Sequence, residues 1–275
     1  MNVALLLLGY GSALTWFGPL LLRRVTGTGV HPQLAVMGWL TMVCAAIAAW
    51  GAALVILGIA VVHSVGRHRT LALCLETLGL TGQLGLPHAI ASALAICLLF
   101  AGLITTAVVC WRIGNHLLRQ RTRSRLHAAT ARAIGGVGAW PNVVVVPAPQ
   151  PVAYCVTGRP HALVVVTTAA LGRLDEQQLA AVLAHEYAHL AGRHHDLLMA
   201  LRAIAASLPR LTLFSAAADV VADLLEMCAD DAAVRRHGKI ALVRGLLALT
   251  APPAMASAAL GAAGTATLAR ATRLA

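Results

Sequence analysis

The sequence predicts a mostly α-helical membrane protein in which three transmembrane helices precede an α+β domain. Hydrophobic residues make up 59% of the 275 residues and charged residues only 11%, whereas soluble domains carry about 25% charged residues. Nine of the ten acidic residues fall between Asp175 and Asp231. This distribution separates an apolar N-terminal region, which suits a bilayer, from a C-terminal region that meets water.

Three apolar segments are long enough to cross a bilayer. They are residues 1–22, 34–62 and 88–111. Arg23 and Arg24 follow the first segment instead of preceding it, so we expect this segment to be an anchor and not a cleaved signal peptide. The six cysteines are scattered and form no CxxC pair, which argues against a disulfide framework.

The arginines set the expected orientation. Only Arg67 and Arg69 lie between the second and third spans, whereas a run of arginines follows the third span: Arg112, Arg119, Arg121, Arg123, Arg125 and Arg132. The positive-inside rule places the N-terminus outside and everything after residue 112 in the cytoplasm of a multi-pass cell-membrane protein. Contact with anionic lipid explains this run, which we expect to form a basic linker helix over 112–139, better than nucleic-acid binding does.

Residues 140–250 are expected to form the water-exposed domain, and residues 251–275 an Ala-rich tail without assigned chemistry. Three short β-branched runs, 142–146, 153–157 and 162–166, are separated by Pro- and Gly-containing turns. This pattern predicts a small antiparallel sheet.

A helix is predicted to begin after Asp175, because Gln178 stands three residues later and completes a capping box. Within it, His185 and His189 are four residues apart and share one face. Two imidazoles at this spacing can bind one zinc ion at about 2.0–2.1 Å. Glu186 lies beside them, where its carboxylate can act as the general base for an activated water.

A catalytic zinc needs a third protein ligand and an open position. Glu226 is the preferred candidate, because acidic residues line one helix face around it, and Asp230 on that face is then placed to orient a ligand histidine. His195 is the alternative, since it completes the longer metzincin pattern. That pattern requires a methionine turn downstream, and Met199 lies in a helix-period stretch.

Residues 197–221 are apolar enough to suggest another span. If Glu226 joins His185 at one metal, however, both must lie on the same side of the membrane. Two extra spans would need about forty residues, more than separate Asp196 from Glu226. We therefore expect this segment to pack on the domain or to lie on the membrane surface.

The stretch VVVTTAALGRLDEQQLAAVLAHEYAHLAGRHHD, followed by EMCADDAA, resembles the gluzincin membrane peptidases. Within them it is most similar to the BlaR/MecR-like antirepressor metallopeptidases, in a short form without the penicillin-binding sensor. The resemblance implies a gluzincin-type zinc peptidase domain after the three spans. It implies that His185, His189 and Glu226 bind Zn²⁺, that Glu186 is the general base, and that Asp230 supports the ligands.

The expected function is that of a membrane-anchored zinc endopeptidase that cleaves a cytoplasmic protein, for which the resemblance suggests a transcriptional repressor. The expected partners are the lipid bilayer and this protein substrate, with no direct nucleic-acid binding. Two alternatives are an HtpX-like protease for membrane-protein quality control and a non-catalytic signal-transducing binding module. The intact Glu186 favours an enzyme, because a purely structural zinc site needs no base.

Overall fold

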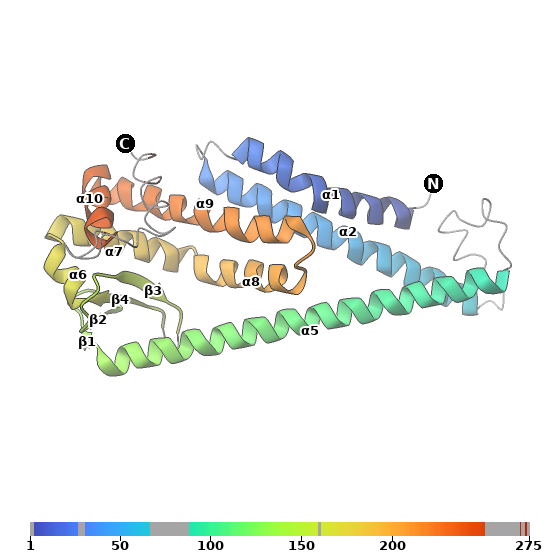
Figure 1. Ribbon diagram of the computed structural model, residues 1–275, viewed down its shortest axis with the longest axis horizontal. Coiled ribbons are helices and arrows are strands. Elements are labelled where there is room, and N and C mark those ends of the chain that lie inside the picture. Colours follow the sequence, from blue (N-terminus) through green and yellow to red (C-terminus); the bar gives the residue numbers. More distant parts are fainter. Residues whose placement is uncertain are drawn as a thin grey trace. The chain divides into compact units, whose positions relative to one another are not determined.

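The computed structural model describes residues 3–26, 31–66, 88–158 and 161–250, together with Arg270 and Arg273. Its helices and strands follow one another along the chain as α1 (Val3–Thr26), α2 (Pro32–Gly66), α5 (His88–Ile134), β1 (Gly136–Val137), β2 (Val143–Val146), β3 (Ala153–Val156), β4 (Leu163–Thr167), α6 (Thr168–Arg173), α7 (Glu176–Ala191), α8 (His194–Ser207), α9 (Thr212–His237) and α10 (Lys239–Thr250) (Figure 1). The predicted mostly α class, with a small sheet after the apolar helices, is confirmed.

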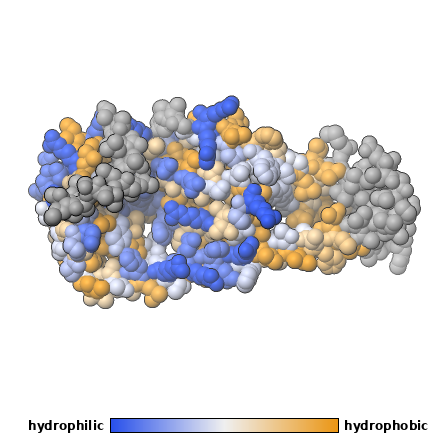
Figure 2. Space-filling model, viewed as in Figure 1, coloured by the Kyte–Doolittle hydropathy of each residue, from blue (hydrophilic) through white to orange (hydrophobic). Residues whose placement is uncertain are grey.

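Three helices are long and apolar enough to cross a membrane, in the segments Val3–Thr26, Pro32–Val62 and Ile96–Ile134. They agree in number with the three predicted spans, and their length and composition indicate a multi-pass membrane protein. Large apolar side chains such as Phe17 and Trp111 point outward from these helices, and hydrophobic surface is visible along them in Figure 2. The third span and the predicted basic linker are one continuous helix, α5. Arg67 and Arg69 lie outside the described residues.

Small residues let α1 and α2 approach each other closely. A β-carbon at Gly11 would meet the indole of Trp50 at 2.6 Å, and one at Gly18 would overlap the sulfur of Met42. The indole N–H of Trp39, whose side chain is fully buried, donates a hydrogen bond to Thr26 at 3.3 Å. Such close approach over small residues is typical of helix pairs in membranes.

Residues 200–221 form one compact unit with residues 1–116. The Thr212 hydroxyl donates to the carbonyl of Thr15 at 2.9 Å, and the ring of Phe214 lies 6.2 Å from that of Trp50. The expectation that the segment packs on the peptidase domain is therefore wrong for residues 200–221, whereas its placement on the membrane surface stays a prediction. The reason is its apolar content, since Leu213 and Phe214 are buried in this unit. Neither α8 nor α9 is among the three helices that are long and apolar enough to span.

The second unit, residues 117–199 and 222–275, contains a four-stranded sheet in the order β1-β2-β4-β3. The expected antiparallel sheet is wrong in one pairing, because β2 and β4 are parallel, whereas β3 and β4 are antiparallel. The Pro-rich connection after β2 explains the difference. Its prolines lack backbone N–H groups and disfavour a tight hairpin. Its six residues are long enough for β3 to lie two positions away from β2 in the sheet, and β4 occupies the position between them.

Helices cover both faces of this sheet (Figure 1). On one face, Val143, Val164 and Val166 pack against Val182 and Leu183 of α7. On the other face, Leu163 and Val165 pack against alanines of α5. Because alternate residues of β4 serve the two faces, the strand is buried along its whole length. Its packing against α7 positions the helix that carries the two site histidines.

Candidate metal centre

Helix α7, which carries the histidine motif, is capped at both ends. The predicted capping box is present: the side chain of Asp175 accepts from the backbone N–H of Gln178 at 2.8 Å, and the Gln178 side chain accepts from the Asp175 N–H at 3.3 Å. The helix ends at Ala191, with Gly192 as its C-cap. The apolar face of α7 packs on the sheet, so the histidines project away from it.

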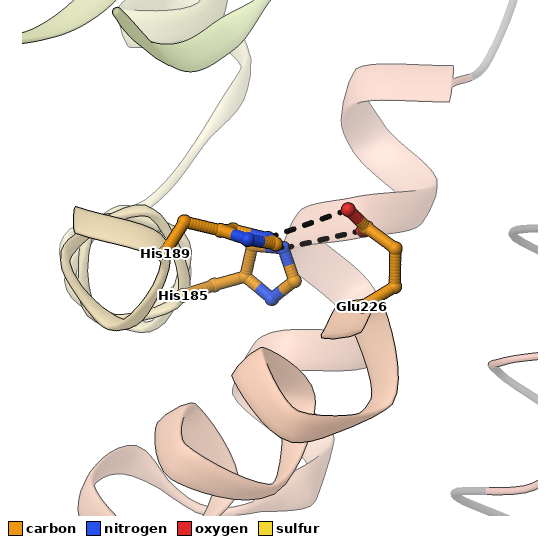
Figure 3. A group of neighbouring side chains, drawn as sticks. All are labelled: His185, His189 and Glu226. Carbon is orange, nitrogen blue, oxygen red and sulfur yellow. Dashed lines mark hydrogen bonds and ion pairs between the residues drawn. The ribbon is translucent and has the colours of Figure 1, made fainter. Parts of the chain in front are cut away.

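Helix α9 brings the predicted acidic residues to the histidines. Ala184 of α7 and Ala233 of α9 belong to one cluster of buried residues between the two helices. Glu226 then faces both histidines, as Figure 3 shows. Its carboxylate oxygens lie 3.6 Å from His185 Nε2 and 3.4 Å from His189 Nε2. The two Nε2 atoms are 3.1 Å apart.

These three distances fit a tetrahedral zinc site. Ligand atoms at about 2.0–2.1 Å from a tetrahedral zinc ion lie about 3.3 Å from one another. The Nε2 atoms of His185 and His189 and a carboxylate oxygen of Glu226 come together at about this separation, within 4.8 Å of one another. Two nitrogens and one carboxylate oxygen are also a ligand set that zinc accepts in catalytic sites. The residues present therefore fit the metal.

Asp230 supports His185 from the side opposite Glu226. Its Oδ1 lies 3.1 Å from His185 Nδ1. The orientation of the N–H does not satisfy hydrogen-bond geometry, so the contact is an ion pair in this structure. Both residues are buried, and Asp230 is completely so. The predicted role of Asp230, to orient a ligand histidine, stays a prediction.

Arg270 reaches the same acidic residues from the C-terminal segment, which the sequence analysis left without chemistry. Its guanidinium donates to both Asp230 oxygens, at 2.8 and 2.5 Å, and to Glu226 at 2.7 Å. These contacts and those of His185 hold the pKa of each carboxyl below its ordinary value, against the effect of burial. Both carboxylates are therefore ionised near neutral pH, as metal ligation requires.

The two candidate ligand histidines differ in charge. Burial opposes protonation of His185, but the carboxylates of Asp230 and Glu226 outweigh it and raise its pKa to about 9. Burial lowers the pKa of His189 to about 4. At neutral pH the metal-free protein thus has a protonated His185 and a neutral His189.

Glu186 lies beside this group with its carboxylate against β3. Burial raises the pKa of Glu186 to about 7, and the nearby His185 and, to a smaller extent, Cys155 oppose the rise. Burial and the nearby Glu186 carboxylate raise the pKa of the Cys155 thiol to about 12, so Cys155 stays a neutral thiol. A carboxyl with a pKa near 7 is suited to exchange protons at physiological pH.

The structure does not bring His195 to the candidate ligands. Its Nε2 lies 3.1 Å from the hydroxyl of Ser124 on α5. The neighbouring His194 is the histidine that faces the site, with its Nδ1 2.9 Å from His189 Nδ1. The sequence analysis considered His195 as the alternative third ligand and gave His194 no role. It missed His194 and Arg270, because neither belongs to a pattern that marks a metal site.

The fold and the site together define a membrane protein whose peptidase motif, His185-Glu186-x-x-His189, lies on a helix that packs against a β-sheet. Residues 117–260, more than half of the chain, match the family described as Peptidase family M48. The chain therefore belongs to peptidase family M48, whose members are metal-dependent proteases.

Two curated relatives are both named protease HtpX homolog. The one from Acidiphilium cryptum is 48% identical over 59 residues, which are 21% of this chain and 20% of the relative. The one from Moorella thermoacetica is 36% identical over 89 residues, which are 31% of this chain and 29% of the relative. The matched segments thus cover less than a third of either relative. No solved structure matches the chain. The relatives fit the HtpX-like alternative and do not confirm the antirepressor type.

Proposed function

We propose that this protein is a zinc endopeptidase of the membrane that cleaves protein substrates on the cytoplasmic side. The observation that carries the proposal is the triangle of His185 Nε2, His189 Nε2 and the Glu226 carboxylate, with separations of 3.1 to 3.6 Å. These separations are close to the distance of about 3.3 Å that tetrahedral zinc imposes between its ligand atoms. Asp230 would hold His185 in place as a metal ligand.

The chemistry follows from the residues around this triangle. When bound, zinc acts as a Lewis acid and makes water a nucleophile at neutral pH. Glu186 would accept the proton of that water at its carboxylate and return it to the leaving amine. Its pKa near 7 suits both steps. The contact with Cys155 would hold the Glu186 carboxylate in place between the two proton transfers.

The cytoplasmic placement rests on the arginines of α5. Arg119, Arg121, Arg123 and Arg125 follow the apolar part of this helix, and such clusters favour the cytoplasmic face. The peptidase unit begins within the same stretch, at residue 117. We therefore propose that the metal centre lies on that face.

Two substrate classes correspond to the two gluzincin types that the sequence resembles. An HtpX-like enzyme would degrade membrane proteins under quality control, and the names of the two relatives support this class. An antirepressor enzyme would cleave a transcriptional repressor.

Metal removal tests the proposed activity. The full chain is purified in detergent, treated with a zinc chelator, dialysed, and assayed on an unfolded protein such as casein. We expect cleavage to stop without metal and to return when about one equivalent of zinc is added. Cleavage that continues unchanged in demonstrably metal-free protein contradicts a zinc peptidase. Cleavage of a purified winged-helix repressor, but not of casein, would favour the antirepressor class.

A further inference from the structure

The chain reverses direction directly after α7 and brings His194 back onto His189. Helix α7 ends at Ala191, Arg193 adopts a left-handed backbone with φ 50°, and α8 begins at His194. The rings of His194 and His189 meet edge to face, with centroids 4.9 Å apart and planes at 86°. The Nδ1 atoms of the two rings are 2.9 Å apart. His194 is 9% exposed, so protein encloses this contact.

The direction of the hydrogen bond between His189 and His194 follows from the role of the other ring nitrogen of His189, Nε2. His189 presents Nε2 to His185 and Glu226. A neutral imidazole that offers a lone pair at Nε2 carries its proton at Nδ1. His189 Nδ1–H must therefore donate, and His194 Nδ1 must accept. Metal-binding histidines usually donate this second N–H to a carboxylate, a backbone carbonyl or water, whereas here the acceptor is another imidazole.

Gly192 provides the space that this arrangement needs. Its backbone is in the ordinary right-handed helical region, at φ −79° and ψ −3°, so backbone conformation does not require a glycine there. A β-carbon at Gly192 would instead overlap the Nε2 and Cδ2 atoms of the His194 ring. The glycine thus admits the His194 ring, which lies directly over the helix end.

We propose that His194 is a positioning residue that fixes the tautomer and the ring orientation of His189 for metal binding, and that Gly192 makes room for it. This inference rests on the proposed metal centre. Loss of a hydrogen-bond partner of a ligand histidine typically weakens metal binding by a factor of about 10–100. His195, one residue further, faces Ser124 and has no part in this role.

Zinc dissociation constants of full-length protein in detergent, measured by competition with a chromophoric chelator, test the proposal. His194→Leu removes the acceptor and should weaken zinc binding by about 10–100-fold. His194→Asn keeps an oxygen near the place of Nδ1 and should restore affinity to within a few-fold of wild type. His195→Leu is the matched control and should bind zinc like wild type.

Gly192→Ala gives a second route that leaves His194 itself intact. We expect it to weaken zinc binding as His194→Leu does, because the new methyl group displaces the ring. Gly172→Ala is its control, since a β-carbon at Gly172 meets no atom within 4 Å. Thermal unfolding of each metal-free variant shows whether the fold is retained. His194→Asn shows whether the loss of affinity in His194→Leu comes from the missing hydrogen-bond acceptor or from the changed packing.

The outcomes distinguish this inference from the proposed function. If His194→Leu and Gly192→Ala bind zinc as tightly as wild type while Glu226→Ala does not bind it, His194 has no positioning role and the metal centre stands. If His195→Leu weakens binding as much as His194→Leu, the assignment to His194 is also wrong. If wild-type protein itself binds no zinc, the proposed metal centre fails, and this inference fails with it.

Discussion

Asp230 contacts His185 on the side of the ring that faces away from Glu226, with Oδ1 3.1 Å from Nδ1. Because Nε2 then points to the other ligands, this carboxylate fixes which nitrogen is offered to a metal. We expect Asp230→Asn to weaken zinc binding by a factor of about 10–100, since the amide cannot balance the charge on the ring. Asp231→Asn is the control, because Asp231 pairs with Arg273 at 3.1 Å. Equal zinc affinities for wild type and Asp230→Asn would show that Asp230 does not support the ligand.

Arg270 balances two carboxylates that would otherwise repel each other in metal-free protein. Arg270→Ala leaves the buried Asp230 without its bidentate partner, and hydrogen bonds to charged groups contribute about 1.5–3 kcal/mol. We expect the metal-free variant to lose about that much stability in chemical denaturation, and the zinc-loaded variant to lose less, because the metal supplies positive charge.

Arg273→Ala is the matched control for Arg270. Its partner Asp231 is partly exposed, and exposed ion pairs contribute about 0–1 kcal/mol. The account of Arg270 is wrong if the two variants unfold at the same denaturant concentration without metal.

Zinc uptake is expected to release a proton from His185. In metal-free protein the carboxylates around His185 raise its pKa to about 9 against the effect of burial, so the ring is protonated at pH 8 and must lose its proton to become a ligand. His189, with a pKa lowered to about 4 by burial, has none to lose. Affinity should therefore rise with pH up to about 9. Calorimetry at pH 8 in buffers of different ionisation enthalpy should give about two protons per zinc, one from His185 and one from water on the metal, whose pKa zinc lowers to about 7. A value of one or less contradicts the charge state of His185.

The orientation of the spans can be tested with reporter fusions. A reporter fused after Arg125, on the basic part of α5, should be active only as a cytoplasmic marker. One fused after Arg69, between the second and third spans, should be active only as an external marker. The reverse result at both positions would place the peptidase unit outside the cytoplasm.

Local patterns were sufficient to predict the helix that carries the motif. The Asp175–Gln178 capping box and Gly192 mark the two ends of α7, and both are encoded within a few residues of their effect. Glu226 and Asp230 could be predicted because helix periodicity places them on one face of α9. The triangle of candidate ligands then follows from the chemistry of zinc, since few other residues could complete it.

Long-range placement could not be predicted in the same way. The parallel pairing of β2 with β4 depends on where a Pro-rich connection returns, which no local pattern fixes. Arg270 lies in an Ala-rich segment without a metal-site motif, so no local pattern marks its contact with Asp230. Spacing in the sequence favours His195 over His194 as a site residue, but the chain reverses at Arg193, with its left-handed backbone, and His194 is the residue that faces His189.

The most direct test of the central claim is the Glu186→Gln variant, measured for zinc content and for proteolysis in the same preparation. Glutamine keeps the size of the side chain but removes the base. We predict that zinc stays near one per chain while cleavage falls by a factor on the order of 100 or more. Glu226→Ala, in contrast, should lose both. If Glu186→Gln cleaves substrate as fast as wild type, Glu186 is not the base. If Glu186→Gln supports the cellular output as wild type does without cleaving substrate, while Glu226→Ala abolishes that output, the metal serves folding and the protein is a binding module instead of a peptidase.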